Sequence, residues 1–335
     1  MQSPDTSRNG MFAKVILASV GQQAPPIYTL HLRYPRIIHA EVKTHRVLSI
    51  DSVLRDDVLD TLDIMSDRDL SRNARSSRAV PVQTMLDEIK SAPFVPWHWG
   101  KNQRGMQAGA ECDEVVALHW DGVMSRQDRE GAWLIARDNA LDAAKGFMEA
   151  GYHKQIVNRL LEPFMWIDTL VTSTEWSNFL WLRDHEAAEP HLRDLAVMVK
   201  EAIDGAQPEL LAPGDWHMPY ITDDERNKAD KGECQKLKND LLRKISAARC
   251  ARISYKPFDG NSTWKAELER YALLVGSDRV HASPVEHQAT PDVFNTGREL
   301  CQFPPDTGWE NPELHGNFTG WIQNRKTIPG ENHSG

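Results

Sequence analysis

Hydrophobic residues in the first fifty positions follow two periodicities. The apolar runs Ala13–Val20 and Ile27–Leu32 are separated by a turn of Gly, Gln and Pro, which predicts two strands. After Tyr34-Pro35, apolar residues recur at helical spacing between Arg36 and Leu48, which predicts a helix. The chain is therefore expected to begin with two strands that lead into a helix.

The acidic stretch 50–71 interrupts this pattern. It is rich in Asp, but its apolar residues fall on one helical face: Leu54, Val58, Leu62 and Met65. We interpret this stretch as a short amphipathic helix inserted between two basic fragments, 44–49 and 71–81.

Helical periodicity dominates the rest of the chain. Helices are predicted at 125–150, 153–164, 174–183, 190–203, 235–249 and 263–275. Residues 205–235 are polar and punctuated by Pro and Gly, which predicts a linker or surface excursion, and 290–335 is expected to be a loop-rich tail. The predicted fold class is α+β, rich in helix and with a small sheet.

Composition narrows the possible classes of protein. A hydrophobic fraction of 40% and a charged fraction of 26% are typical of soluble globular proteins. A net charge of -9 argues against a protein that binds nucleic acid directly through its phosphates. No apolar run is long enough for a membrane span, no signal-peptide core is evident, and the four cysteines are scattered, so we expect a cytoplasmic location and no membrane partner.

The two basic fragments form a candidate anion site. When residues 50–71 are set aside, the fragments fuse into His-Arg-Val-Leu-Ser-Arg-Asn-Ala-Arg-Ser-Ser-Arg. Guanidinium groups, hydroxyls and backbone N–H groups in one short turn-forming stretch are what a phosphate or nucleotide needs.

Four further clusters have a composition suited to binding, and each has a plainer explanation. Residues 97–107 combine Trp with Lys and Arg, which suits a planar ring beside an anionic group but also fits a surface loop with buried Trp. Arg159, Asn178 and Arg183 are by default solvated helix positions. The segments 251–255 and 281–287 are both dense in polar residues. A helix cap explains part of the segment 281–287 without any binding function. The aromatic and basic cluster 320–326 fits either a binding segment or a mobile, solvated tail.

Taken together, these segments resemble the flavin-dependent thymidylate synthases. That family has an Arg-His-Arg, two spacers, Ser, spacer, Asn-Glu, spacer, Ser, spacer, Arg signature. The matching positions here are His45, Arg46, Asn73, Ser76 and Arg78. The resemblance extends to Asn-Phe-x-x-Leu-Arg at 178–183, Ala-Arg-x-Ser at 251–254 and His-x-Ser-Pro-x-Glu-His at 281–287. The last two elements come first in the common family and last here, so the chain resembles long, circularly permuted, virus-encoded relatives.

The resemblance implies a function and a set of site residues. The whole chain, 1–335, would be a single catalytic domain with a small, mostly antiparallel sheet, working as a homotetramer. It would transfer a one-carbon unit from methylenetetrahydrofolate to C5 of a pyrimidine deoxynucleotide, using FAD and NADPH. The implied catalytic residues are Arg183 and Arg78. The implied substrate-binding residues are Ser76, Ser77, Arg78, Arg159 and Arg183. The implied FAD-binding residues are His45, Arg46, Asn73, Asn178, Ser254, His281, Ser283 and Glu286, and no metal is implied.

Because the sequence departs from the family signature at two positions, the signature does not fix which nucleotide is the substrate. Thr44 stands where the first Arg is usual, and Ala74 stands where the Glu is usual. We expect methylation of dUMP to dTMP, with methylation or hydroxymethylation of dCMP or dUMP for viral DNA modification as the alternative.

Two readings from other classes also remain. The segment His185–His191 could be a metal-hydrolase fragment, although Pro190 interrupts its helix and no third ligand is evident. The chain could also be a catalytically inactive nucleotide-binding subunit, in which case it would take up no FAD.

Overall fold

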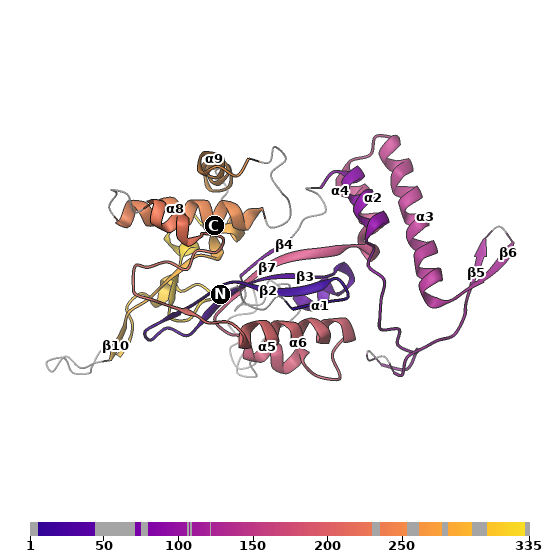
Figure 1. Ribbon diagram of the computed structural model, residues 1–335, viewed down its shortest axis with the longest axis horizontal. Coiled ribbons are helices and arrows are strands. Elements are labelled where there is room, and N and C mark those ends of the chain that lie inside the picture. The colour runs from indigo at the N-terminus through magenta and orange to yellow at the C-terminus, as the bar shows by residue number, and fades with distance from the viewer. Residues whose placement is uncertain are drawn as a thin grey trace, which may run out of the picture.

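A six-stranded sheet forms the centre of the molecule (Figure 1). The computed structural model describes residues 6–43, 71–74, 80–105, 107, 109–120, 122–229, 235–252, 261–276, 281–296 and 307–331. The strand order is β1-β2-β3-β7-β4, all antiparallel, and β8 pairs with β2 in parallel. The strands are β1 (Thr6–Arg8), β2 (Met11–Gly21), β3 (Ile27–Pro35), β4 (Ser71–Ala74), β7 (Trp166–Ser173) and β8 (Glu209–Leu211). The α+β class, the mostly antiparallel sheet and the two predicted strands are confirmed.

One face of the sheet is covered by a long helix. Leu30 and Leu32 of β3 point to this face and form an apolar core with Leu195 and Val199 of α6 (Pro190–Asp204). Pro190 begins α6, where its missing N–H leaves no helical hydrogen bond unmade. The short helix α5 (Ser177–Arg183) lies beside α6 below the sheet in Figure 1, which confirms both predicted helices.

A second apolar core joins the helices at the right of Figure 1, which lie between β4 and β7 in the sequence. Its elements are α2 (Val82–Ser91), α3 (Arg129–Glu149), α4 (Lys154–Val157) and η3 (Asn158–Phe164). The predicted helix 125–150 begins too early, because Ser125–Gln127 belong to β6 (Val123–Gln127), which pairs with β5 (Val116–Trp120). Asp128 then caps α3 by accepting a hydrogen bond from the N–H of Gly131 at 2.7 Å.

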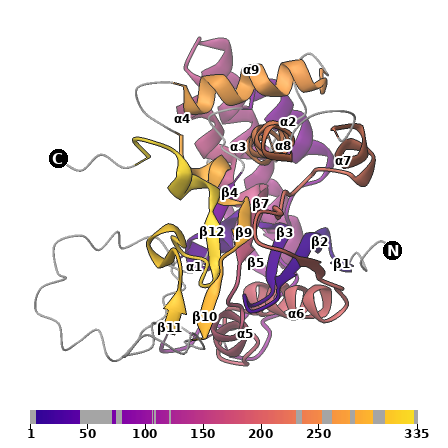
Figure 2. The same cartoon turned by 90° about the vertical axis from the view of Figure 1, so that its left-hand side faces the viewer.

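The C-terminal third packs against the other end of the sheet. It contains α7 (Asp223–Ala229), α8 (Gln235–Ala251) and α9 (Trp264–Val275), of which the last two were predicted. Its short elements are η4 (Ser283–Glu286), β9 (Ala289–Pro291), β10 (Phe294–Thr296), β11 (Thr307–Trp309), η5 (Pro312–Leu314), β12 (Trp321–Gln323) and η6 (Asn324–Thr327). Figure 2 shows β9 and β12 side by side, as their antiparallel pairing requires.

The structure revises two interpretations of irregular segments. Part of 205–235 is built into the fold, because β8 hydrogen-bonds with β2 and because Trp216, His217 and Met218 are buried. The C-terminal segment around Trp321 is not a mobile tail, since that side chain is fully buried in a core with Phe318.

The predicted helix at 36–48 is found in part. η1 (Arg36–Ile38) and α1 (His39–Lys43) account for its first half, and the remainder lies outside the described residues, as does the predicted insert up to residue 70. In the described parts of the chain, no helix combines the length and hydrophobicity that crossing a bilayer requires.

Candidate functional site

The predicted site residues divide into those whose side chains the structure describes and those it does not. Outside the described side chains lie His45, Arg46, Asn73, Ser76, Ser77, Arg78 and Ser254, although the backbone of Asn73 belongs to β4. The described ones are Arg159, Asn178, Arg183, His281, Ser283 and Glu286.

Two distant parts of the sequence signature meet at one edge of the sheet. η4, which carries Ser283 and Glu286, lies against β4, which carries Asn73. β4 is held there by pairing with β7, in a register that places Ser71 opposite Thr172. The structure therefore brings the two segments together, and we call this place the β4–η4 junction.

The C-terminal segment holds the junction in position. Arg325 of η6 forms an ion pair with Glu286, and Gln323 donates a hydrogen bond to the backbone oxygen of Glu286 at 2.9 Å. Burial raises the pKa of Glu286, and the nearby Arg325 opposes that shift. The positioning roles of Arg325 and Gln323 were missed. No sequence signal indicated them, because β12 is only three residues long and its alternating burial is visible only in the structure.

A chain of buried hydroxyl and imidazole groups starts directly after η4. His287 Nδ1 is 2.8 Å from Thr172 Oγ1, which is 2.7 Å from Thr29 Oγ1. Thr29 Oγ1 is 2.8 Å from His217 Nε2, and His217 Nδ1 is 2.9 Å from Ser19 Oγ. All five residues are buried, so the chain ties β2, β3 and β7 to the segments around 217 and 287.

Burial keeps both imidazoles of this hydrogen-bond network, those of His217 and His287, neutral. Burial lowers the pKa of His287 to about 3. Burial, and then the charge of Arg226 and the proximity of His287, lower the pKa of His217 to about 3. His287 Nε2 is buried and has no hydrogen-bond partner among the described residues. A neutral ring nitrogen of this kind can donate or accept one further hydrogen bond, according to its tautomer.

Arg183 has an incompletely satisfied guanidinium. It lies in the last turn of α5, and its Nη2 donates to the backbone oxygen of Glu41 at 3.3 Å. Its Nε is buried and has no hydrogen-bond partner among the described residues. Burial lowers the pKa of Arg183, and Glu41 opposes that shift. Asn178 lies in the first turn of the same helix and is half-buried.

Arg159 belongs to a different part of the molecule. It lies in η3 beside the second core, and its half-exposed guanidinium donates to Glu162 at 3.2 Å. Within one subunit, Arg159 and Arg183 therefore contact different parts of the fold. His281 is anchored through its backbone N–H, which donates to Leu274 O at 2.9 Å.

The Trp-rich segment 97–107 docks on α6 through its first residues. Trp97 Nε1 donates to Asp194 at 2.8 Å, and His98 Nε2 lies 3.0 Å from the same carboxylate. Trp97 also contacts His191 edge-on, with 4.5 Å between ring centroids. These contacts favour the plainer explanation of buried Trp in a surface loop for this part of the segment.

The segment 185–191 is accounted for by local hydrogen bonds. His185 Nδ1 accepts from the N–H of Ala187 at 3.1 Å, and His191 Nδ1 lies 2.6 Å from Glu189. Among the residues the structure describes, no group of three or more His, Cys, Asp or Glu side chains is arranged to hold a metal ion. No known protein family matches the chain, and no curated protein matches it.

Proposed function

We propose that this chain catalyses flavin-dependent one-carbon transfer to C5 of a pyrimidine deoxynucleoside monophosphate, with dUMP to dTMP as the reaction. Methylenetetrahydrofolate would be the carbon donor and NADPH the reductant. The supporting observation is the β4–η4 junction, where two separated parts of the signature lie side by side. Two segments that each contribute contacts to one flavin have to meet in space, and these two do.

The unpaired nitrogens of the described residues fit such ligands. Arg183 Nε–H is a buried donor without an acceptor, and His287 Nε2 is a buried ring nitrogen without a partner among those residues. Leaving a buried polar group unsatisfied costs about 1–3 kcal/mol, so a ligand that supplies the missing partner gains binding free energy. Flavin and pyrimidine rings both carry carbonyl and N–H groups along their edges.

The chain's own residues would bind and orient rather than react covalently. Bound flavin would supply the redox chemistry of one-carbon transfer. Ser283, Glu286 and Asn73 would seat it at the β4–η4 junction, while Arg183 would face the pyrimidine and stabilise negative charge on the activated ring. Cys250 is no candidate nucleophile, because burial raises the pKa of its thiol to about 12.

The proposal includes assembly of the site from several copies of the chain. Arg159 would reach the nucleotide phosphate of a neighbouring subunit, since within its own chain it lies beside the second core with Glu162. A homotetramer would meet this requirement, and an isolated subunit would then be inactive.

The absorbance spectrum of the purified protein tests the proposal first. The visible bands of oxidised flavin should appear after incubation with FAD and should bleach when NADPH is added. A protein that takes up no FAD would instead favour the inactive, nucleotide-binding subunit.

Mass analysis of the nucleotide then identifies the substrate. dUMP and dCMP are each incubated with methylenetetrahydrofolate and NADPH, and a one-carbon gain on dUMP alone supports thymidylate synthesis. A gain on dCMP, or a hydroxymethyl product, supports the DNA-modification alternative, for which Ala74 at the end of β4 is the relevant departure. Arg183→Gln should abolish the product while the flavin spectrum remains, and Arg193→Gln on the exposed face of α6 is the matched control.

A further inference from the structure

The second face of the central sheet carries a row of polar side chains. Along β3, Thr29, His31 and Arg33 alternate with the core residues Leu30 and Leu32, so they point away from α6. On the neighbouring strand β7, the same face carries Thr172, Asp168 and Trp166, as shown by the contacts of these residues with Thr29, His31 and Arg33. The row runs from the buried hydroxyl–imidazole chain at one end to an open cleft at the other.

Arg33, at the open end, has no carboxylate partner in the part of the chain that the structure describes. Asp168 lies opposite it in the strand register, but the Asp168 carboxylate is 3.0 Å from His31 Nε2. Among the described residues, no carboxylate oxygen lies within ion-pairing distance of the Arg33 guanidinium, which lies over the Trp166 ring, 5.8 Å from the ring centroid. Arg36 differs in this respect, since it pairs with Glu162 at 3.5 Å.

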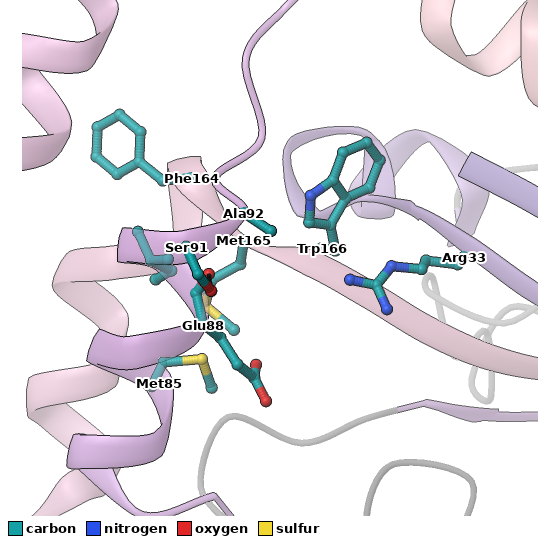
Figure 3. Close-up of a pocket in the computed structure, with 9 residues that line it drawn as sticks. Arg33, Met85, Glu88, Ser91, Ala92, Phe164, Met165 and Trp166 are labelled. Atoms are coloured by element: carbon teal, nitrogen blue, oxygen red, sulfur yellow. Dashed lines mark hydrogen bonds between the residues drawn. The ribbon is translucent and has the colours of Figure 1, made fainter. Parts of the chain in front are cut away.

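A cleft opens on both sides of this Arg–Trp pair. One lobe, of about 490 Å³, is lined by Arg33 and Trp166 together with Phe12, Arg8 and Pro93. The other lobe, of about 90 Å³, reaches α2, where Glu88 lines it beside the apolar side chains of Met85, Ile89, Phe164 and Met165. Arg33, Ala92 and Trp166 line both lobes, and Figure 3 shows the Arg33 guanidinium beside the indole and turned toward the cleft. The larger lobe has the volume of an ordinary small-molecule site.

The indole is fixed in place by its neighbours. Phe94 contacts it edge-on, with 5.5 Å between ring centroids. On the other side lies the β1–β2 turn, in which Asn9 and Gly10 both have positive φ. A Cβ on Gly10 would come within 2.9 Å of Trp166 Cζ2, so this glycine allows the turn to pack closely against the benzo ring of the indole. A rigid aromatic surface costs little conformational entropy when a ligand binds.

We propose that this cleft binds a planar aromatic anion, with the ring stacked on Trp166 and the anionic group held by Arg33. Arg8 also lines the cleft, but it pairs with Glu201 at 2.8 Å, which leaves Arg33 as the unpaired cation among the described lining residues. A guanidinium binds phosphate or carboxylate in a bidentate geometry, and an indole face stacks on any flat ring. A nucleoside phosphate and the aminobenzoylglutamate part of a folate both combine a planar ring with an anionic group. The choice of a folate rests on the proposed function.

Calorimetric titration of the full chain tests this proposal. The ring-bearing anions are AMP and 4-aminobenzoylglutamate, and the incomplete probes are adenosine, which lacks the charge, and inorganic phosphate, which lacks the ring. We expect at least one ring-bearing anion to bind about tenfold or more tightly than either incomplete probe, a difference of about 1.4 kcal/mol. The probe that binds identifies the source of the ligand. If neither binds, the proposal is overturned.

Variants locate the binding. Arg33→Gln should weaken it about tenfold or more, whereas Arg36→Gln, on the same edge of the molecule but already paired, should not. Loss of binding in Arg183→Gln and not in Arg33→Gln would place the probe at the proposed nucleotide site and overturn the cleft. Retained binding in Arg33→Gln would also overturn it.

A measurement on the unmutated chain shows whether the probe binds at Trp166, even if a variant fails to fold. With fluorinated tryptophan, the ¹⁹F signal that disappears in Trp166→Phe should be the one that shifts when the probe is added to the parent chain. A probe that binds without moving this signal refutes the cleft assignment, and the flavin spectrum plays no part in this result.

Discussion

Acidification should destabilise this fold through its two buried imidazoles. Burial lowers the pKa of His217 and His287 from 6.5 to about 3, so both rings stay neutral in the folded chain. In the unfolded chain each ring takes up a proton near its ordinary pKa. Because the unfolded state then binds more protons, stability falls as the pH drops below about 6.5 and continues to fall until about 3.

The magnitude follows from the two pKa values. With pKa 6.5 in the unfolded state and about 3 in the folded state, lowering the pH from 7 to 5 costs about 2 kcal/mol for each imidazole, and about 4 kcal/mol for the pair. That is a large part of the roughly 5–15 kcal/mol that stabilises a typical domain.

Urea unfolding at pH 7, 6 and 5 measures the effect. Other groups also titrate in this range, so the decisive quantity is the difference between variants. His287→Gln, whose amide can still hydrogen-bond to Thr172, should reduce the loss between pH 7 and pH 5 by about 2 kcal/mol. His119→Gln removes an exposed imidazole on β5 as the matched control and should keep the pH dependence of the parent. If His287→Gln loses as much stability as the parent between pH 7 and pH 5, the reasoning is refuted.

Two further predictions concern the β1–β2 turn and the C-terminal segment. Gly10→Ala should lower the free energy of unfolding by about 2 kcal/mol or more, through positive φ and contact with Trp166. Gly122→Ala has similar φ but open space around its Cβ, so it should cost only about 1 kcal/mol by urea unfolding, and equal losses would disprove the contact. Arg325→Gln leaves the Glu286 carboxylate without its guanidinium and should cost about 1–3 kcal/mol at pH 7. Since the pKa of Glu286 is raised, this loss should shrink as the pH falls toward 5 and the carboxyl is protonated, and a loss that does not change with pH would contradict the ion-pair account.

Element types were predictable where the pattern is local. The strands β2 and β3 and the helices α6, α8 and α9 appear close to their predicted bounds, since side-chain periodicity follows from the geometry of one element. The hairpin turn at Asn9-Gly10 was also readable in principle, because both residues favour the positive φ that such a turn needs, but it was not predicted.

Elements that depend on a distant partner were missed. Glu209–Leu211 form a strand because they lie beside β2, which is far earlier in the sequence, as the register of Ser19 with Glu209 shows. The short strand β12 likewise exists through its pairing with β9. Three-residue strands carry too little periodicity to be recognised without the partner that supplies their hydrogen bonds.

The candidate site shows the same division. Sequence motifs named Glu286 and Arg183, because the residue types and their spacing resemble a known signature. They did not indicate that Arg325 neutralises Glu286 or that Thr172 links His287 to His217 by way of Thr29, since these contacts join residues far apart in the chain.

By itself, the sequence determined the mixed fold class, the main helices and the chemistry present in each motif, since these depend on composition and local spacing. The tertiary structure alone decided that η4 meets β4. It also decided that Asp168 pairs with His31 and leaves Arg33 beside Trp166. Strand register and long-range packing set which side chains become neighbours, and a one-residue shift of register would move each of them to the other face of the sheet.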